Sequence, residues 1–159
     1  MVFTGTYEHS IDVKNRLAIP SDVRNLLQRN LDESESIYLF VTLGEGQALC
    51  LYTETGFEHR AAELDHSELD PDQLLAYERL MFSLARRVEI DKQGRVRLPE
   101  NLIKMANLNT DVVLIGVKDH LEIRDRQTWH THVKQMLEMQ PQILMNPRRA
   151  MGARSPRSS

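Results

Sequence analysis

The sequence contains one cysteine in 159 residues and no apolar run long enough to cross a bilayer. A single Cys50 excludes an internal disulfide framework and a multi-cysteine metal site. Because Cys50 lies within an apolar run, we expect a buried, unreactive thiol rather than a nucleophile. The N-terminus lacks the basic start and apolar stretch of a secretory signal peptide. We therefore expect a cytoplasmic protein with no membrane partner.

Motifs of catalysis and cofactor binding are also missing. The sequence has no glycine-rich phosphate loop and no nucleophile with a plausible base beside it. Its six histidines are scattered, and His130 and His132 lie two apart on an expected helix, so they face different sides of it. We therefore expect no enzyme activity, no catalytic residue, no metal, no cofactor and no small-molecule substrate.

The net charge of -3 conceals an uneven distribution along the chain. Residues 54–80 carry eight acids against two arginines, whereas residues 86–106 carry six bases against three acids. Residues 141–159 hold four arginines and no acid, have no hydrophobic periodicity, and are predicted to form a disordered basic tail. Because electrostatic attraction acts over roughly 8 Å at physiological salt, local patches decide which partners bind, and the net charge does not exclude nucleic acid.

The most informative feature is an internal repeat. Residues 7–20 align with residues 86–99 at an offset of 79, and the shared core reads Ile-Asp-x-x-x-Arg-hydrophobic-x-hydrophobic-Pro. Downstream, residues 49–51 align with residues 121–123 at an offset of 72. The difference of seven residues is explained by a polar insertion at residues 30–36 in the first copy, which we predict to be a loop.

Each copy has the same expected order of elements. A strand approaches the aspartate, a second strand runs to the proline, and the proline precedes a short helix. Two more strands and an amphipathic helix follow. A further helix between the copies should begin after Asp70, with Pro71 in its first position and Gln73 completing a capping box. The expected ranges are helices at residues 21–27 and 100–106, and strands at 37–43, 48–53, 112–117 and 120–124.

The repeated Asp-x-x-x-Arg segment is predicted to be a tight hairpin turn. Asp12 and Asp91 suit such a turn because their carboxylates accept backbone N–H bonds two residues on. Gly94 supplies the positive φ that many hairpin turns require, and Asn15, at the equivalent position, tolerates that conformation best after glycine. These four residues are therefore expected to shape the two hairpins.

The arginine of each motif is expected to leave the turn and project from the hairpin tip, together with Lys14 or Lys92. Two such tips make a β-ribbon edged with cations, a shape that enters a DNA groove. One such segment alone indicates only a solvated surface hairpin. Two copies in the same structural position favour a functional reading, although a duplicated hairpin can also serve folding alone.

These motifs resemble the MraZ family over about residues 1–140. The resemblance rests on both Asp-x-x-x-Arg motifs with their flanking residues: Tyr7-Glu8-His9-Ser10-Ile11-Asp12, Arg16-Leu17, Ile19-Pro20, Leu51-Tyr52, Val88 to Arg95, Leu98-Pro99, Val113 to Val117 and Glu122-Ile123. Asn15 departs from the family's usual glycine. Each copy is small and strand-rich, so two copies are expected to interleave their strands in one shared core.

The resemblance implies an α+β fold with a mainly β core, built from two AbrB-like swapped-hairpin (double-psi-like β) repeats with short flanking helices. It implies a nucleoid-associated transcriptional regulator that binds double-stranded DNA, at direct repeats upstream of the division and cell-wall gene cluster. It also implies self-association as a cyclic homo-oligomer. The DNA-contacting residues that it implies are Lys14, Arg16, Lys92, Arg95 and Arg97.

We expect a first repeat at residues 1–54, a helical connector at 55–84, a second repeat at 85–128, a C-terminal helix at 129–140 and the basic tail at 141–159. The rival interpretation is a swapped-hairpin protein-interaction module, either antitoxin-like or a ring scaffold, without specific DNA binding. No feature of the sequence excludes it.

Overall fold

The structure is a computed structural model that describes residues 1–139 and residue 142. The chain divides into two compact units, residues 1–127 and 128–159. The predicted basic tail lies outside the described residues except for residue 142. The residue bounds given above for repeats and connector remain predictions.

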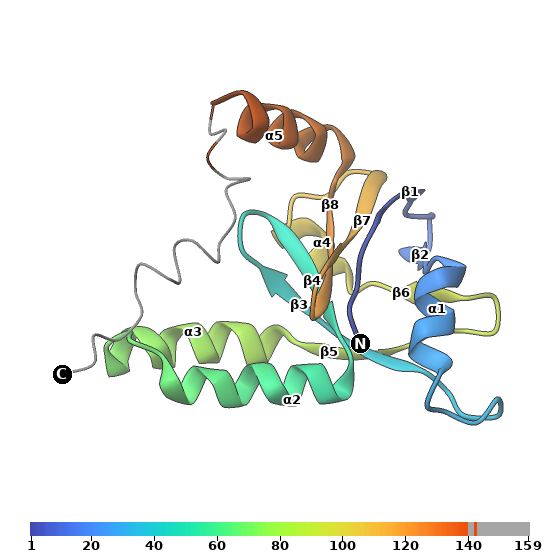
Figure 1. The fold of residues 1–159 in the computed structure, drawn as a ribbon, viewed down its shortest axis with the longest axis horizontal. Coiled ribbons are helices and arrows are strands. Elements are labelled where there is room, and N and C mark those ends of the chain that lie inside the picture. Colours follow the sequence, from blue (N-terminus) through green and yellow to red (C-terminus); the bar gives the residue numbers. More distant parts are fainter. Residues whose placement is uncertain (140–141, 143–159) are drawn as a thin grey trace. The chain divides into compact units, whose positions relative to one another are not determined.

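The first unit contains eight strands and most of the helices of the described chain (Figure 1). In chain order the elements are β1 (Thr6–Ser10), β2 (Arg16–Ala18), α1 (Ser21–Gln28), β3 (Tyr38–Gly44), β4 (Ala48–Tyr52), α2 (Glu54–Glu63), the short 3-10 helix η1 (Leu64–His66), α3 (Pro71–Leu84), β5 (Arg86–Glu89), β6 (Arg95–Arg97), α4 (Glu100–Met105), β7 (Asp111–Val117), β8 (His120–Asp125) and α5 (Arg126–Met139).

The strands form a six-stranded sheet in the order β1-β7-β8-β4-β3-β5 and a separate two-stranded ribbon, β2–β6. All pairs are antiparallel. The first strand of each copy lies beside the β-hairpin of the other copy, β1 next to β7 and β5 next to β3. This exchange confirms the expected α+β fold with two swapped-hairpin repeats.

The registers show that the copies are related by an approximate twofold axis. In the middle of the large sheet Cys50 pairs with Glu122, and in the ribbon Leu17 pairs with Val96. Both pairs join residues that occupy equivalent positions in the sequence repeat. The axis therefore passes near both pairs, and equivalent residues of the two copies meet on it.

The main core lies between the sheet and the ribbon and is supplied by both copies. Leu17 and Val96 on the ribbon are completely buried. Strand β4 is buried at every position, which suits a central strand covered on both faces. Helices α1 and α4 contribute Val23, Leu27 and Leu102. The other fully or almost fully buried large side chains are Ile19, Leu39, Val41, Leu49, Leu51, Leu98, Leu114, Leu121 and Ile123.

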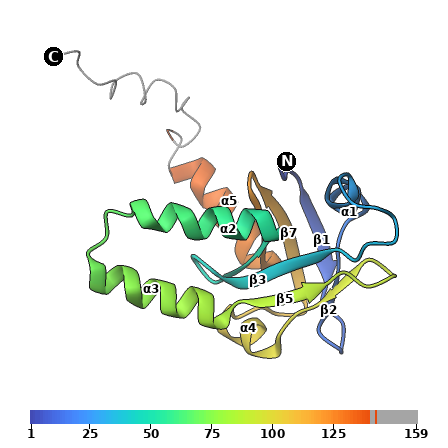
Figure 2. The ribbon, with the colours of Figure 1, turned by 90° about the horizontal axis from the view of Figure 1, so that it is seen from below.

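Helices α2 and α3 run side by side and pack against the other face of β4 (Figures 1 and 2). Helix α3 begins as predicted, because the Asp70 carboxylate accepts hydrogen bonds from the backbone N–H groups of Asp72 and Gln73, at 3.0 and 3.1 Å. The buried Thr42 hydroxyl donates to the Met81 carbonyl at 2.7 Å, which ties α3 to β3.

The segment at residues 30–36 is a loop, as its polar composition predicts. The expected short helices after Pro20 and Pro99 are present, and each proline occupies the N-cap position. None of the helices in the described part of the chain has the length and apolar content of a membrane span.

Candidate nucleic-acid interface

The two Asp-x-x-x-Arg loops have the same backbone. In the first, the Asp12 N–H donates to the Arg16 carbonyl at 3.0 Å, and the Asn15 N–H donates to the Asp12 carbonyl at 3.0 Å. The second loop repeats both bonds at 2.8 and 2.9 Å between the equivalent residues. Asn15 has a φ of 61° and Gly94 a φ of 78°, so asparagine does adopt the glycine conformation.

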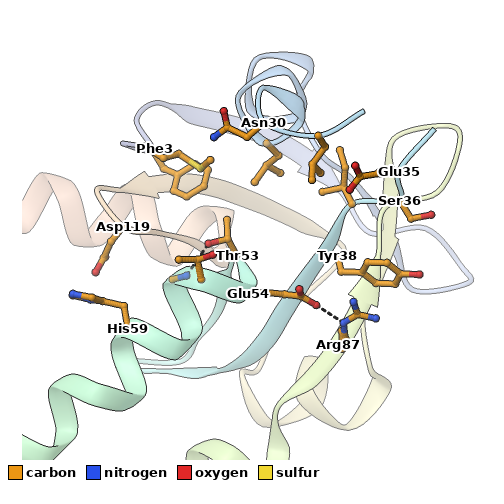
Figure 3. Close-up of a pocket in the computed structure, with 16 residues that line it drawn as sticks. Phe3, Asn30, Glu35, Ser36, Tyr38, Thr53, Glu54, His59, Arg87 and Asp119 are labelled. Atoms are coloured by element: carbon orange, nitrogen blue, oxygen red, sulfur yellow. Dashed lines mark hydrogen bonds and ion pairs between the residues drawn. The ribbon is translucent and has the colours of Figure 1, made fainter. Parts of the chain in front are cut away.

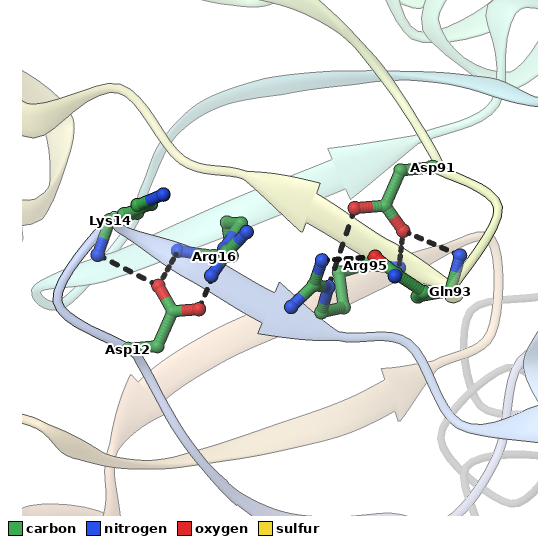
Figure 4. A network of polar contacts seen from close by, with 6 residues as sticks. All are labelled: Asp12, Lys14, Arg16, Asp91, Gln93 and Arg95. Carbon is green, nitrogen blue, oxygen red and sulfur yellow. Dashed lines mark hydrogen bonds and ion pairs between the residues drawn. The ribbon is translucent and has the colours of Figure 1, made fainter.

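Each aspartate accepts backbone hydrogen bonds within its own loop (Figure 4). Asp12 Oδ1 accepts from the backbone N–H groups of Lys14 and Arg16, each at 2.9 Å. Asp91 Oδ1 accepts from the equivalent two groups, also at 2.9 Å. The backbone hydrogen bond from the arginine is the largest cause that holds the pKa of each carboxyl below its ordinary value.

The arginine side chains differ from the expectation that they project freely from the tips. Arg16 Nε lies 2.7 Å from Asp12 Oδ2, and Arg95 Nε lies 3.3 Å from Asp91 Oδ2. Arg95 also donates to the Gln93 side chain (Figure 4). Each arginine therefore turns back toward its own loop, because a carboxylate four residues away satisfies part of its charge. The side chains remain 29% and 28% exposed.

The ribbon has one apolar and one basic face. Side chains alternate along a strand, so burial of Leu17 and Val96 leaves their neighbours on the outer face. On that face Arg16 lies opposite Arg97, and Arg95 lies opposite Ala18. The outer face therefore carries three of the five predicted contact residues.

The other two predicted residues, Lys14 and Lys92, are exposed at the loop tips. They are not equivalent in the repeat, since Lys92 aligns with Val13, a residue that is 99% exposed. Lys14 aligns instead with Gln93. Among the residues that the structure describes, Lys14, Lys92 and Arg97 have no recorded ion pair.

Each loop is also anchored by the other copy. The Ile19 N–H donates to the Gly94 carbonyl and the Leu98 N–H donates to the Asn15 carbonyl, both at 2.8 Å. Gly94 is buried, and a Cβ there would lie 2.7 Å from the Arg24 guanidinium. The sequence did not predict this mutual anchoring, because it depends on the pairing of β2 with β6. These bonds join the two loops into one continuous surface.

Two cavities lie away from the ribbon's basic face. One, of about 890 Å³, is lined by residues of the N-terminal segment, the 30–38 loop and α2 (Figure 3). At its edge Arg87 Nε lies 2.5 Å from Glu54 Oε1, and the Arg87 guanidinium lies 3.6 Å above the Tyr38 ring. Arg87 is thus already paired. The other cavity, of about 830 Å³, lies between the sheet and helices α2 and α3.

Comparison with known proteins places this architecture in a family. The family model described as "MraZ protein, putative antitoxin-like" matches residues 2–75 and 81–143. A relative from Mycoplasmoides gallisepticum, named transcriptional regulator MraZ, is 39% identical over 126 residues, covering 78% of this chain and 82% of the relative. A relative of the same name from Clostridium tetani is 40% identical over 133 residues, covering 82% and 87%. With two successive matches over two interleaved copies, the chain belongs to the MraZ family.

Proposed function

We propose that this protein is a transcriptional regulator that binds double-stranded DNA through the outer face of the β2–β6 ribbon and its loop tips. The observation on which this proposal rests is that both copies place cations on the outer face of the ribbon, where backbone hydrogen bonds join the two loops. Arg16, Arg95 and Arg97 lie on that face, and Lys14 and Lys92 lie at the loop tips beside it. Two relatives that carry the name transcriptional regulator MraZ support the same function.

Phosphate contacts are the chemistry that this surface suits best. Lys14, Lys92 and Arg97 have no recorded ion pair among the described residues, so binding DNA breaks no existing salt bridge at these positions. A guanidinium has five N–H donors in a fixed fork, so the bond from Arg16 to Asp12 leaves donors for a phosphate or a base edge. The aspartates act by fixing the loops, which reduces the ordering cost of binding.

Self-association completes the proposal. Helix α3 exposes Leu75, Tyr77 and Leu80, which are 45%, 38% and 56% exposed. Large apolar side chains grouped on one helix are typical of subunit contacts. A cyclic homo-oligomer built this way presents several identical ribbons, which suits direct DNA repeats because linked contacts gain effective concentration. The target we propose is the promoter region of the division and cell-wall gene cluster, with the protein cytoplasmic and nucleoid-associated.

The test is a titration of labelled duplex DNA from upstream of this protein's own gene, carrying one or three direct repeats. The wild-type protein should bind three repeats more tightly than one. Lys92→Ala and Arg97→Ala should each weaken binding and reduce the slope of log affinity against log salt by about 1. Lys134→Ala, which removes an exposed charge from α5 and lies outside both the ribbon and α3 in the sequence, is the matched control. Equal affinity for one and three repeats would refute multivalent binding, and unchanged affinity of both ribbon variants would refute the interface.

A protein-interaction module remains the second candidate, favoured by the exposed apolar residues of α3 and by the antitoxin-like description of the family model. A module of this kind would leave duplex DNA unbound at low salt. The same titration at low ionic strength therefore separates the two functions.

A further inference from the structure

A second chemical cluster lies on the sheet face opposite the ribbon. Cys50 on β4 pairs directly with Glu122 on β8. His120 is two residues before Glu122 on the same strand, so both side chains are on the same face. Helices α2 and α3 cover this face beside Cys50, where Tyr52 and Met81 complete a small apolar cluster.

The three side chains bring a thiol, an imidazole and a carboxylate together. One ligand atom from each lies within 4.8 Å of the other two. His120 Nε2 lies 3.0 Å from Glu122 Oε2. The Cys50 residue is 5% exposed, and the His120 and Glu122 side chains are 17% and 16% exposed. Within the described residues this is the one group of three such donors.

The neighbours of the cluster hold its donors in the orientation that a metal requires. His120 Nδ1 lies 2.7 Å from Asp119 Oδ1, and its Nε2 faces Glu122 Oε2 at 3.0 Å, so an ion would replace this second contact and find Nε2 already directed into the cluster. Metal-bound histidines commonly donate their other ring N–H to a carboxylate, a backbone carbonyl or a water. Arg124 Nε donates to Glu122 Oε1 at 2.8 Å, which leaves Oε2 on the side of the cluster. These outer contacts therefore leave His120 Nε2 and Glu122 Oε2 facing the cluster.

Space for an ion is present as well. The cluster lines the cavity of about 830 Å³ under α2 and α3. Gly44 lies beside the sulfur, and a Cβ on Gly44 would come within 2.5 Å of Cys50 Sγ. The absence of that side chain keeps the approach to the sulfur open.

We propose that Cys50, His120 and Glu122 form a binding site for Zn²⁺ or a similar thiophilic divalent ion. Sulfur, imidazole nitrogen and carboxylate oxygen are the three ligand types that zinc uses in proteins. Water from the cavity would complete a tetrahedral set. Because Cys50 belongs to the first copy and the other two ligands to the second, the ion would cross-link the two repeats near their twofold axis. The site does not depend on the DNA interface.

The test uses Zn²⁺ and Co²⁺ added to the metal-free full-length protein. Calorimetry should give one Zn²⁺ per chain, the melting temperature should rise with zinc, and Co²⁺ should produce the absorption of a cobalt–thiolate bond. Cys50→Ser and His120→Gln should lose the thiolate absorption and the thermal shift. His59→Gln, which removes an exposed histidine of α2, should keep both.

A measurement on the unaltered protein guards against variants that fail to fold. X-ray absorption at the zinc edge should show one sulfur at about 2.3 Å and nitrogen or oxygen ligands at about 2.0–2.1 Å. The contacts of His120 with Asp119 and Glu122, at 2.7 and 3.0 Å, also suit a metal-free ion-pair cluster in which protonated His120 bridges the two carboxylates. Absence of bound zinc, a spectrum without sulfur, or metal binding unchanged by Cys50→Ser would each overturn the proposal in favour of that cluster.

Discussion

The two Asp-x-x-x-Arg loops share a backbone but differ in the side chains that they expose. Both keep the aspartate, the arginine and a residue with positive φ. The first presents Val13 and Lys14 where the second presents Lys92 and Gln93, and Ala18 stands where the second copy has Arg97. The residues that fix the loop are therefore held in common, whereas the outer face is more basic in the second copy. We infer that the second copy contributes more of the proposed DNA affinity.

The largest difference between the loops is expected at the residue with positive φ. Gly94→Val should lower the free energy of unfolding by about 2–3 kcal/mol, because valine resists a φ of 78° and its Cβ would displace the Arg24 side chain. Asn15→Gly, at the equivalent position, should change stability by less than about 1 kcal/mol. Urea denaturation of both variants measures the difference. Equal losses would show that the positive φ is not the cause of the destabilisation by Gly94→Val.

Exchanging the residues that differ between the two copies on the outer face tests what each copy contributes to DNA binding. Arg97→Ala should weaken DNA binding and reduce the salt slope by about 1, whereas Ala18→Arg should strengthen binding by adding a cation at the equivalent position. Anisotropy titrations at several salt concentrations measure both. If Ala18→Arg leaves affinity unchanged while Arg97→Ala lowers it, position 18 of the first copy lies outside the contact.

The smallest effect is expected from pH. The pKa values of Asp12 and Asp91 are lowered in the folded protein. Their charged forms therefore stabilise the folded state at pH values above the ordinary aspartate pKa of 3.8. This stability should be lost as the pH falls below about 3.8 and through the folded-state pKa values. Replacement of both residues by asparagine should flatten that part of the pH profile of urea denaturation. A wild-type-like profile in the double variant would assign the acid sensitivity to other carboxyls.

The local structure was readable from the sequence because it depends on neighbours in the chain. The turn residues, the prolines before α1 and α4 and the Asp70 cap all act over a few positions. The strand patterns do not by themselves predict the pairing of β4 with β8, although the alignment of residues 49–51 with 121–123 contains the necessary information. Equivalent strands on a twofold axis must present equivalent residues to each other, which brings Cys50 to Glu122.

The position of the arginine side chains could not be derived in the same way. Whether Arg16 points outward or returns to Asp12 depends on a balance between hydration and an ion pair that is partly exposed. The sequence patterns alone do not bring a cysteine of one copy together with a histidine of the other. Separation of Cys50 and His120 by seventy positions hides a contact that folding creates.

The exchange of strands between the copies has a consequence for how this chain can change over evolutionary time. In a homodimer of a single-copy ancestor, every substitution would occur twice, once on each side of the symmetry axis. Joining both halves in one polypeptide removes that constraint, because a codon can change in one half alone. Val13 and Lys92, or Ala18 and Arg97, illustrate the freedom gained on the exterior, whereas buried equivalents such as Leu17 and Val96 both remain aliphatic.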